Sequence, residues 1–318
     1  MKTLKSFAVV LIVPTLYAML VRGFYGVSPW ENLYQVMLMS FIVGVPVGVG
    51  AITQIVAPHK WAMNWFYTLF APWAPAIFFF LLTLALAWEG WICWVMILPF
   101  FQVFASVGSV LMHLIRFYLF KKTSSLNVTA ILLIPFLFAP IESRLEVKPK
   151  IFSAVTYIDI KSTKEKIWSN VTRVRIISEA EDKRKISRFM KFPRPLFAEL
   201  DTHSVGGRRL ATFDKGLVFD EVVNVYEHEK KMSFSITPLT NEIPPVTMDE
   251  HIIVGGKYFT VLDGTYELEK LNDETYRLHL TSRFQLRTSF NFYSGLWSEW
   301  IMKDIQNNIL QIIKERSE

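Results

Sequence analysis

The sequence SGLWSEWIMKDIQNNILQIIKER, residues 294–316, decides the fold of the C-terminal half of this chain. Apolar side chains recur there at intervals of three and four residues, the spacing of one face of an α-helix. They are Tyr293, Trp297, Trp300, Ile301, Ile305, Ile309 and Ile312, whereas Lys303, Gln306, Gln311 and Lys314 fall mostly elsewhere. Two interpretations are open: a helix lying on a membrane surface, or the central helix of a domain whose sheet wraps around it.

The residues before this helix alternate between apolar and polar side chains, as half-buried strands do. Strands are predicted at 151–160, 208–213, 217–226, 231–236, 250–254, 257–271 and 275–287. Ser162 and Glu165 have the spacing of a capping box and predict a short helix. Residues 173–190 are polar and predict a helix or a loop. A sheet with one apolar face needs a cover, so the strands favour the packed-helix interpretation.

Residues 1–142 have the composition of membrane-spanning helices. They contain seven Lys and Arg residues and three acids, against 27 and 25 in the rest of the chain. A helix needs about 20 apolar residues to cross a bilayer. Five apolar segments predict five crossings, with four as the alternative: 4–21, 33–57, 74–88, 91–118 and 126–141. Pro72 and Pro75 predict that residues 61–70 form an interfacial or re-entrant lead-in to the third segment.

Positive charge is concentrated in alternate connections between these segments. Lys2 and Lys5 precede the first segment, Lys60 lies in the second connection, and Lys121 and Lys122 lie in the fourth. Because basic connections face the cytoplasm, the N-terminus is predicted there. Five crossings would place the C-terminal domain outside the cytoplasm, and four would place it inside. We expect an integral protein of the plasma (inner) membrane, with this domain on the non-cytoplasmic side.

The second apolar segment contains Gly44 and Gly48, a small-xxx-small pattern that predicts close helix–helix packing, including association between copies of the chain. The spans show no periodic acids and no arginine series, which argues against a pump or an ion channel. The predicted organisation is a multi-span transmembrane region at residues 1–145 and a second domain at 146–318. The fold class is therefore transmembrane α-helices followed by an α+β domain, a curved antiparallel sheet around a long C-terminal helix.

Several short stretches of the second domain carry a resemblance when they are read in order. They are VTYIDIK (155–161) before EKIW (165–168), GGRR (206–209) before FDEVV (219–223), then GTYEL (264–268) and the closing helix. In this order they resemble the SRPBCC superfamily, which includes START-like lipid-transfer domains, polyketide cyclases and dehydratases. The resemblance covers about residues 150–317. It implies a helix-grip fold with a cavity for a hydrophobic ligand such as a lipid, a sterol-like or an aromatic molecule.

Five residues are predicted to contact such a ligand. Glu221 shares its side of a strand with apolar residues, and a carboxylate there is costly to bury unless it is paired. Its alternative role is an acid paired with Arg208 or Arg209. Tyr266 would point inward and offer its hydroxyl, or serve as a core tyrosine. The closing helix would contribute the remaining three, Trp297, Trp300 and Asp304, as a pocket wall, unless Asp304 caps the rim of the domain.

The sequence lacks the motifs of several other functions. It has no metal-ligand spacing, P-loop or dinucleotide fingerprint, so no metal or cofactor is expected. The small charge excess of the second domain gives little support for nucleic-acid binding. We expect a membrane-anchored binding protein for a hydrophobic small molecule, with a lipid as the first candidate. Two alternatives stay open: a cyclase- or dehydratase-like enzyme using Glu221 or Asp304 with Tyr266 assisting, and a non-catalytic membrane assembly protein.

Overall fold

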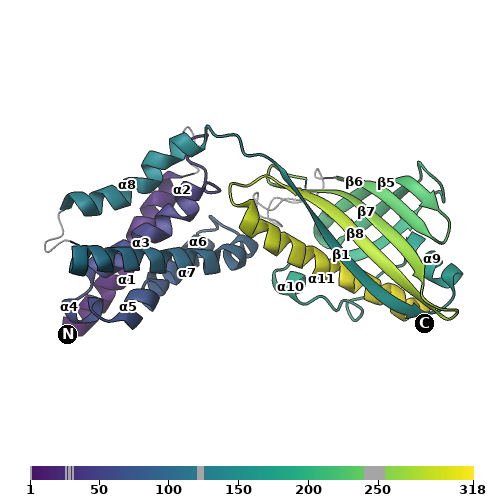
Figure 1. The fold of residues 1–318 in the computed structure, drawn as a ribbon, viewed down its shortest axis with the longest axis horizontal. Helices are drawn as coiled ribbons and strands as arrows, with labels where there is room; N and C mark the ends of the chain where they lie inside the picture. Colours follow the sequence, from purple (N-terminus) through teal and green to yellow (C-terminus); the bar gives the residue numbers. More distant parts are fainter. Residues whose placement is uncertain (1, 26, 28–29, 31, 120–124, 240–254) are drawn as a thin grey trace. The chain divides into compact units, whose positions relative to one another are not determined.

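The structure is a computed structural model that describes the chain except residues 1, 26, 28–29, 31, 120–124 and 240–254 (Figure 1). The strand predicted at 250–254 lies outside the described residues. The chain divides into two compact units, Met1–Val147 and Lys148–Glu318. Each unit is described by itself below.

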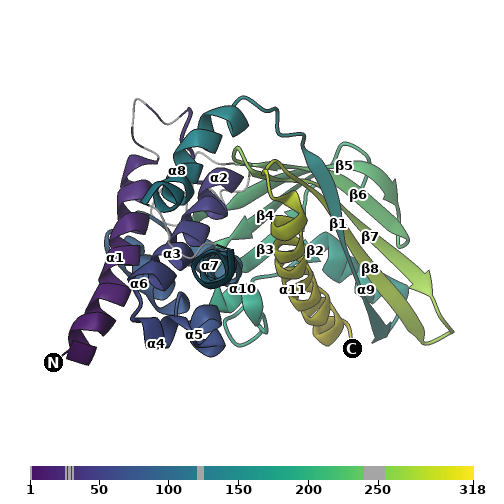
Figure 2. The ribbon, with the colours of Figure 1, turned by 60° about the vertical axis from the view of Figure 1, so that its left-hand side comes forward.

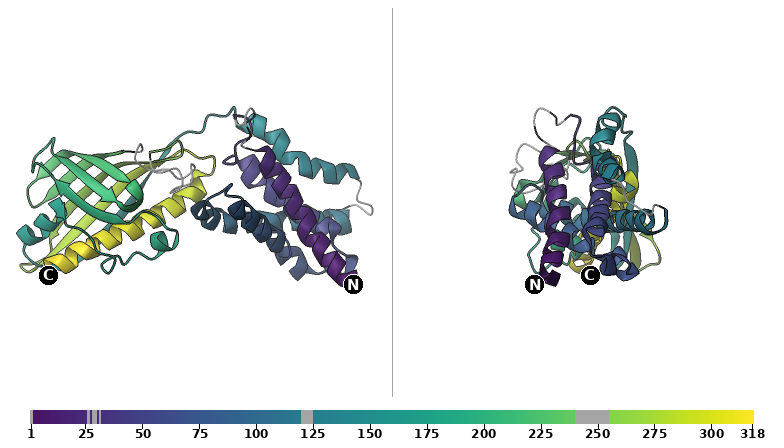
Figure 3. Two further views of the ribbon diagram at one scale, coloured as in Figure 1. Left: turned by 180° about the vertical axis from the view of Figure 1, so that it is seen from behind. Right: turned by 90° about the vertical axis from the view of Figure 1, so that its left-hand side faces the viewer.

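Unit 1 is helical (Figure 3). Its helices are α1 (Lys2–Phe24), α2 (Met39–Ile42), α3 (Gly44–Val56), α4 (His59–Ala62), α5 (Trp65–Phe70), α6 (Trp73–Ala85), α7 (Trp91–Leu114), the π-helical η1 (Ile115–Leu119) and α8 (Ser125–Glu142). Within the described residues, four segments are long and apolar enough to cross a membrane: Leu4–Phe24, Met39–Val56, Trp65–Ala85 and Trp91–Phe117. The fifth predicted segment forms α8, whose described apolar part, Leu132–Glu142, is shorter.

Most of the lead-in predicted at residues 61–70 belongs by length and composition to the third candidate span. Trp65–Ala85 forms one apolar span in which α6 follows α5 almost directly. Pro72 has helical backbone angles, φ −63° and ψ −16°, and stands at the N-terminal boundary of α6. Pro75 lies in the first turn of that helix. The missing N–H groups of these prolines therefore remove no interior hydrogen bond, and the chain passes through them as a helix.

The glycines of α3 allow close packing inside unit 1. A Cβ on Gly48 would lie 2.5 Å from the ring of Tyr17 on α1, and one on Gly44 would lie 3.0 Å from Pro135 on α8. The closest approach is at Gly50, where a Cβ would overlap the backbone oxygen of Ala105 on α7. These glycines therefore pack against neighbours in the same chain. Association between copies through Gly44 and Gly48 stays a prediction.

The described residues of unit 2 form an eight-stranded antiparallel sheet. The sheet curls around the long helix α11 (Asn291–Ser317), as Figure 2 shows. Its strands are β1 (Lys150–Lys161), β2 (Arg173–Val174), β3 (Pro195–Leu200), β4 (Arg208–Phe213), β5 (Val218–Glu227), β6 (Lys231–Pro238), β7 (Phe259–Lys270) and β8 (Thr275–Leu286). The helices are α9 (Lys164–Thr172), α10 (Ile186–Phe189), the short η2 (Asp214–Gly216) and α11 (Asn291–Ser317). The sheet order is β1-β8-β7-β6-β5-β4-β3-β2. The predicted fold class is confirmed.

Two local features differ from the predictions. Strands β2 and β3 were not predicted, because β2 is only two residues long and Pro195 begins β3, where proline suggests a break. The N-cap of α9 is Thr163, whose hydroxyl accepts from the Lys166 amide at 3.4 Å, and not Ser162. The Ser162 hydroxyl instead donates to the Ser317 carbonyl at 2.7 Å, which ties the end of α11 to the start of α9.

The main core of unit 2 lies between the concave face of the sheet, α9 and α11. Its buried members include Ile160, Ile167, Trp168, Val223, Met232, Phe234, Leu278, Leu280, Leu310 and Ile313. In β8 the even-numbered residues from Leu278 to Leu286 are buried, as the alternation predicts, and Tyr276 is half-buried. The concave face therefore meets the C-terminal half of α11 through packed apolar side chains.

Candidate ligand site

A buried ion pair lies on the concave face of the sheet. The register of β4 and β5 places Arg209 directly opposite Glu221, so the two side chains leave the sheet on the same side. Arg209 Nη1 donates to Glu221 Oε2 at 2.5 Å, and both side chains are about 5% exposed. A buried charge is very costly unless it is paired. The cross-strand register therefore makes each of these charges tolerable to the fold.

Two aromatic rings flank the Arg209 guanidinium. Its Cζ lies 5.8 Å from the ring centre of Tyr266 and 5.7 Å from that of Phe234, within the range of cation–π attraction. Phe234 comes close to the sheet because its neighbour is Gly264, where a Cβ would lie 2.7 Å from the Phe234 ring. We call Arg209, Glu221, Phe234 and Tyr266 the Arg209 cluster.

One donor of this cluster has no hydrogen-bond partner in the part of the chain that the structure describes. This donor is Arg209 Nε, which is buried. An unpaired buried donor costs about 1–3 kcal/mol, and more when it belongs to a charged group. A ligand with an acceptor oxygen at this position would remove that cost.

Burial also changes the acid–base properties of the cluster. It raises the pKa of the Glu221 carboxyl, and the neighbouring Arg209 guanidinium opposes this shift. Burial likewise raises the pKa of the Tyr266 phenol, which keeps the hydroxyl protonated at neutral pH. The cluster thus places a guanidinium, a carboxyl group and a phenol among apolar side chains. Such surroundings suit a ligand with an apolar body and one polar group.

The three predicted residues of α11 lie in other surroundings. Asp304 accepts hydrogen bonds from the Ser187 amide at 2.9 Å, the Ser187 hydroxyl at 2.7 Å and the Lys185 amide at 3.2 Å. Asp304 therefore caps the start of α10, in agreement with the alternative that it caps the rim of the domain. Trp300 is exposed and Trp297 is half-buried, with ring centres 5.7 Å apart. The prediction that Trp300 faces the interior is wrong, because α11 is rotated so that Ile301 faces inward instead.

Gln306 is a buried polar residue that the sequence pattern placed outside the apolar face. Its side-chain oxygen accepts from the Thr156 hydroxyl at 3.1 Å, and its nitrogen donates to the Ser282 hydroxyl at 2.9 Å. These bonds connect α11 to β1 and β8. The periodicity of the apolar residues gives no sign of this, because a glutamine at the border of the apolar face reads as exposed.

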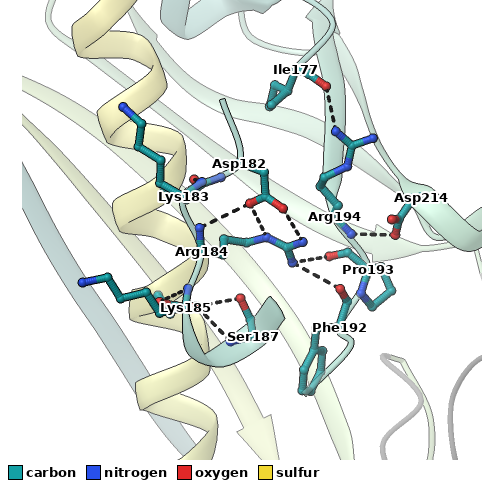
Figure 4. Close-up of polar contacts among 12 residues, drawn as sticks. Ile177, Asp182, Lys183, Arg184, Lys185, Ser187, Phe192, Pro193, Arg194 and Asp214 are labelled. Atoms are coloured by element: carbon teal, nitrogen blue, oxygen red, sulfur yellow. Dashed lines mark hydrogen bonds and ion pairs between the residues drawn. The ribbon is translucent and has the colours of Figure 1, made fainter. Parts of the chain in front are cut away.

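A second buried ion pair, Asp182 with Arg184, lies in the segment between β2 and β3 (Figure 4). Arg184 donates from Nε to Asp182 Oδ1 at 2.8 Å, and from Nη1 to the Pro193 carbonyl at 2.9 Å. The Lys183 amide donates to Asn308 of α11 at 2.7 Å. This pair is therefore bonded to neighbouring backbone and fastens its segment to α11, which indicates a structural role.

Among the described residues, no group of three or more His, Cys, Asp or Glu side chains is arranged to hold a metal ion.

The outward-facing arginines of β8 form ion pairs with acids on the neighbouring strands. Arg277 pairs with Asp159 at 2.7 Å and Arg283 pairs with Asp263 at 2.6 Å. These two charges are therefore matched within the sheet.

No protein-family model matches this chain, and no curated protein matches it in sequence. Solved structures with similar folds include a START superfamily protein from Mycobacterium smegmatis (9% identity, TM-score 0.34, covering 52% of this chain and 96% of that one). Others are norcoclaurine synthase from Thalictrum flavum (11%, 0.32, 54% and 91%) and the Zhui aromatase/cyclase from Streptomyces sp. R1128 (10%, 0.34, 52% and 94%). We therefore base the function on the geometry of the Arg209 cluster.

Proposed function

We propose that this chain is a membrane-anchored binding protein for a hydrophobic small molecule, with a lipid as the first candidate. Arg209, Glu221 and Tyr266 would hold the polar group of this ligand. The observation that carries the proposal is the buried Arg209 Nε, which has no partner among the described residues. The donor points to a ligand with an acceptor oxygen, such as a carbonyl or hydroxyl group. The apolar residues of the sheet and α11 around this cluster form a buried core, and the proposal requires the apolar body of the ligand to lie among them.

Hydrogen bonds within unit 1 support the membrane part of this proposal. The Tyr17 hydroxyl donates to the Leu132 carbonyl at 3.1 Å, and that of Tyr25 to the Pro135 carbonyl at 2.6 Å. Contacts that advance along both helices in this order indicate that α8 runs in the same direction as α1. Glu142, at the end of α8, accepts from the Met39 amide at 2.6 Å, at the start of the second span. This supports a fifth crossing and a domain on the side opposite the N-terminus.

The test is the molecule that co-purifies with the full chain in detergent, identified by mass spectrometry after organic extraction. The variant is Arg209→Met with Glu221→Leu, because replacing both members of a buried pair by apolar residues preserves folding far better than replacing one. The control is Arg208→Met with Asp220→Leu, a pair on the other face of the same two strands in which Arg208 is exposed and Asp220 is half-buried. We expect the wild type and the control to retain an apolar molecule that the variant loses. Absence of any such molecule from the wild type, or equal amounts in all three proteins, would overturn the proposal.

A cyclase- or dehydratase-like reaction is the second candidate. The observation in its favour is the raised pKa of the buried Glu221 carboxyl beside Tyr266, since a general acid works best with its pKa near neutrality. Asp304 is engaged by α10, so Glu221 is the better acid or base of the two. Incubation of the extracted molecule with wild type and with Glu221→Gln distinguishes binding from catalysis. Chemical change with the wild type alone would favour the enzyme.

A further inference from the structure

The outward face of α11 is apolar along its first turns only. Phe292, Leu296 and Trp300 recur every fourth residue, so they lie on one face of the helix, and they are 61%, 67% and 55% exposed. We call these three residues the α11 stripe. Further along, the same face carries Lys303, Asn307, Gln311 and Lys314. The apolar character of this face is therefore confined to one end of the helix.

That end of α11 lies where the chain enters unit 2. The Asn291 side chain donates to the Lys148 carbonyl at 3.4 Å. Six residues lead from Glu142, the last residue of α8, to Lys148. Because an extended chain spans at most about 3.6 Å per residue, the connection reaches about 20 Å. The α11 stripe thus begins within a short tether of a predicted membrane helix.

Exposed basic residues accompany the stripe at this end. Arg144 and Lys148 lie in the connection, Lys150 begins β1, and Arg287 follows β8, where Lys150 pairs with the last residue of that strand. One exposed acid, Glu146, lies among them. Basic side chains near a bilayer attract anionic headgroups, and tryptophan is enriched at the headgroup level of membranes.

We propose that the α11 stripe docks on the surface of the bilayer that holds unit 1, with Leu296 and Trp300 entering the boundary between headgroups and acyl chains. The proposal rests on the membrane anchoring proposed above and is independent of any ligand in the Arg209 cluster. It joins the two interpretations of residues 294–316: the inward face packs against the sheet, and the first turns of the outward face contact lipid.

The test places single cysteines in the full chain, in a Cys93→Ser background that removes its only cysteine. Leu296→Cys and the control Asn307→Cys, on the polar part of the same face, each carry an environment-sensitive fluorophore. The protein is reconstituted at one copy per nanodisc of phosphatidylcholine and phosphatidylglycerol. Quenching is measured with nitroxide-labelled lipid and with iodide in the buffer. A third label at exposed Val103 of α7 reports membrane insertion of unit 1.

We expect the label at position 296 to be quenched several-fold more by the nitroxide lipid than the label at position 307, which iodide quenches instead. Adding Phe292→Ser and Trp300→Ser should reduce the lipid quenching at position 296. Equal iodide quenching at both positions, or shielding of position 296 from both quenchers by a protein surface such as a second copy, would overturn the docking. Failure of the label at position 103 to be quenched by lipid would instead overturn the membrane anchoring.

Discussion

The two halves of α11 differ in which face carries their apolar side chains. In the C-terminal half, Leu310, Ile312 and Ile313 are buried against the sheet and the outward face is polar. In the N-terminal half, Ile301 is buried, but Leu296 and Trp300 are exposed on the outward face. Amphipathicity is therefore a property of a helix segment, and one helix can serve a core and a second surface along its length.

The largest expected difference between the halves is in stability. Leu310→Ala removes a fully buried side chain and should lower the free energy of unfolding of unit 2 by about 2–5 kcal/mol. Leu296→Ala should change it by about 0.5 kcal/mol or less, because that side chain is exposed. Pulse proteolysis of the full chain in detergent across a urea series measures both. Equal losses for the two variants would contradict the assignment of the faces.

Gln306, between the two halves of α11, tests whether hydrogen bonds to the sheet hold this helix in place. Gln306→Ala removes the partner of the Ser282 hydroxyl, leaves the Thr156 hydroxyl with the Leu280 carbonyl alone, and should cost about 1–3 kcal/mol. The neighbouring Asn307→Ala, at an exposed position, is the control and should have little effect. The same proteolysis assay applies, and a tolerated Gln306→Ala would show that packing alone positions the helix.

The stability of residues 182–187, which are bonded to α11 through the Lys183 amide and Asn308, should depend on pH. Burial alone would raise the pKa of Asp182, but hydrogen bonds and charge from Arg184 outweigh it and hold this pKa below the ordinary aspartate value. A carboxyl group whose pKa is lowered in the folded state stabilises the fold at pH values above its unfolded pKa, which is about 4 for aspartate. This stability is lost as the pH falls through the folded-state pKa. The protection of the amides of residues 183–187 against hydrogen exchange, relative to their intrinsic rates, should therefore fall below about pH 4.

The control for this pH dependence is Asp182→Asn. It removes the carboxylate that pairs with the buried Arg184, should cost about 3 kcal/mol or more at neutral pH, and should flatten the acid dependence of protection in the same segment. An unchanged pH profile in this variant would assign the acid sensitivity to another group.

The smallest expected effect is that of Trp300→Ser on stability, about 0.5 kcal/mol or less, because the ring is exposed. Its effect on lipid quenching at position 296 should be large by comparison. A stability loss of several kcal/mol would show that Trp300 packs within the domain and would weaken the distinction between the two halves.

Much of the fold follows from local patterns. Alternation in β8 and in the strands before it predicts the sheet, and the remaining long amphipathic helix predicts its cover. Strands β2 and β3 escape prediction because they are short or begin with proline, so their pairing depends on neighbours rather than on local preference. The joined third span escapes for a related reason, since prolines at the start of a helix read as breaks in the sequence.

The candidate site was only partly predictable. Parity placed Glu221 and Tyr266 on the concave side, and their burial agrees with it. Arg209 was one of two possible partners for Glu221, and only the β4–β5 register selects it over Arg208, which pairs with Asp220 on the other face. The ligand-contacting roles of Glu221, Tyr266 and Trp297 stay predictions, whereas Trp300 is exposed and Asp304 caps α10.

The sequence alone determined the apolar segments, the alternating strands and the amphipathic closing helix, because each is a periodic pattern within one segment. Only the tertiary structure decided how α11 is rotated, which arginine neutralises Glu221, and that Asp304 caps α10. These depend on strand register and on packing between segments distant in the chain. A period of two or 3.6 residues predicts that a strand or helix has an apolar face. Which segment covers that face depends on the packing of the whole fold.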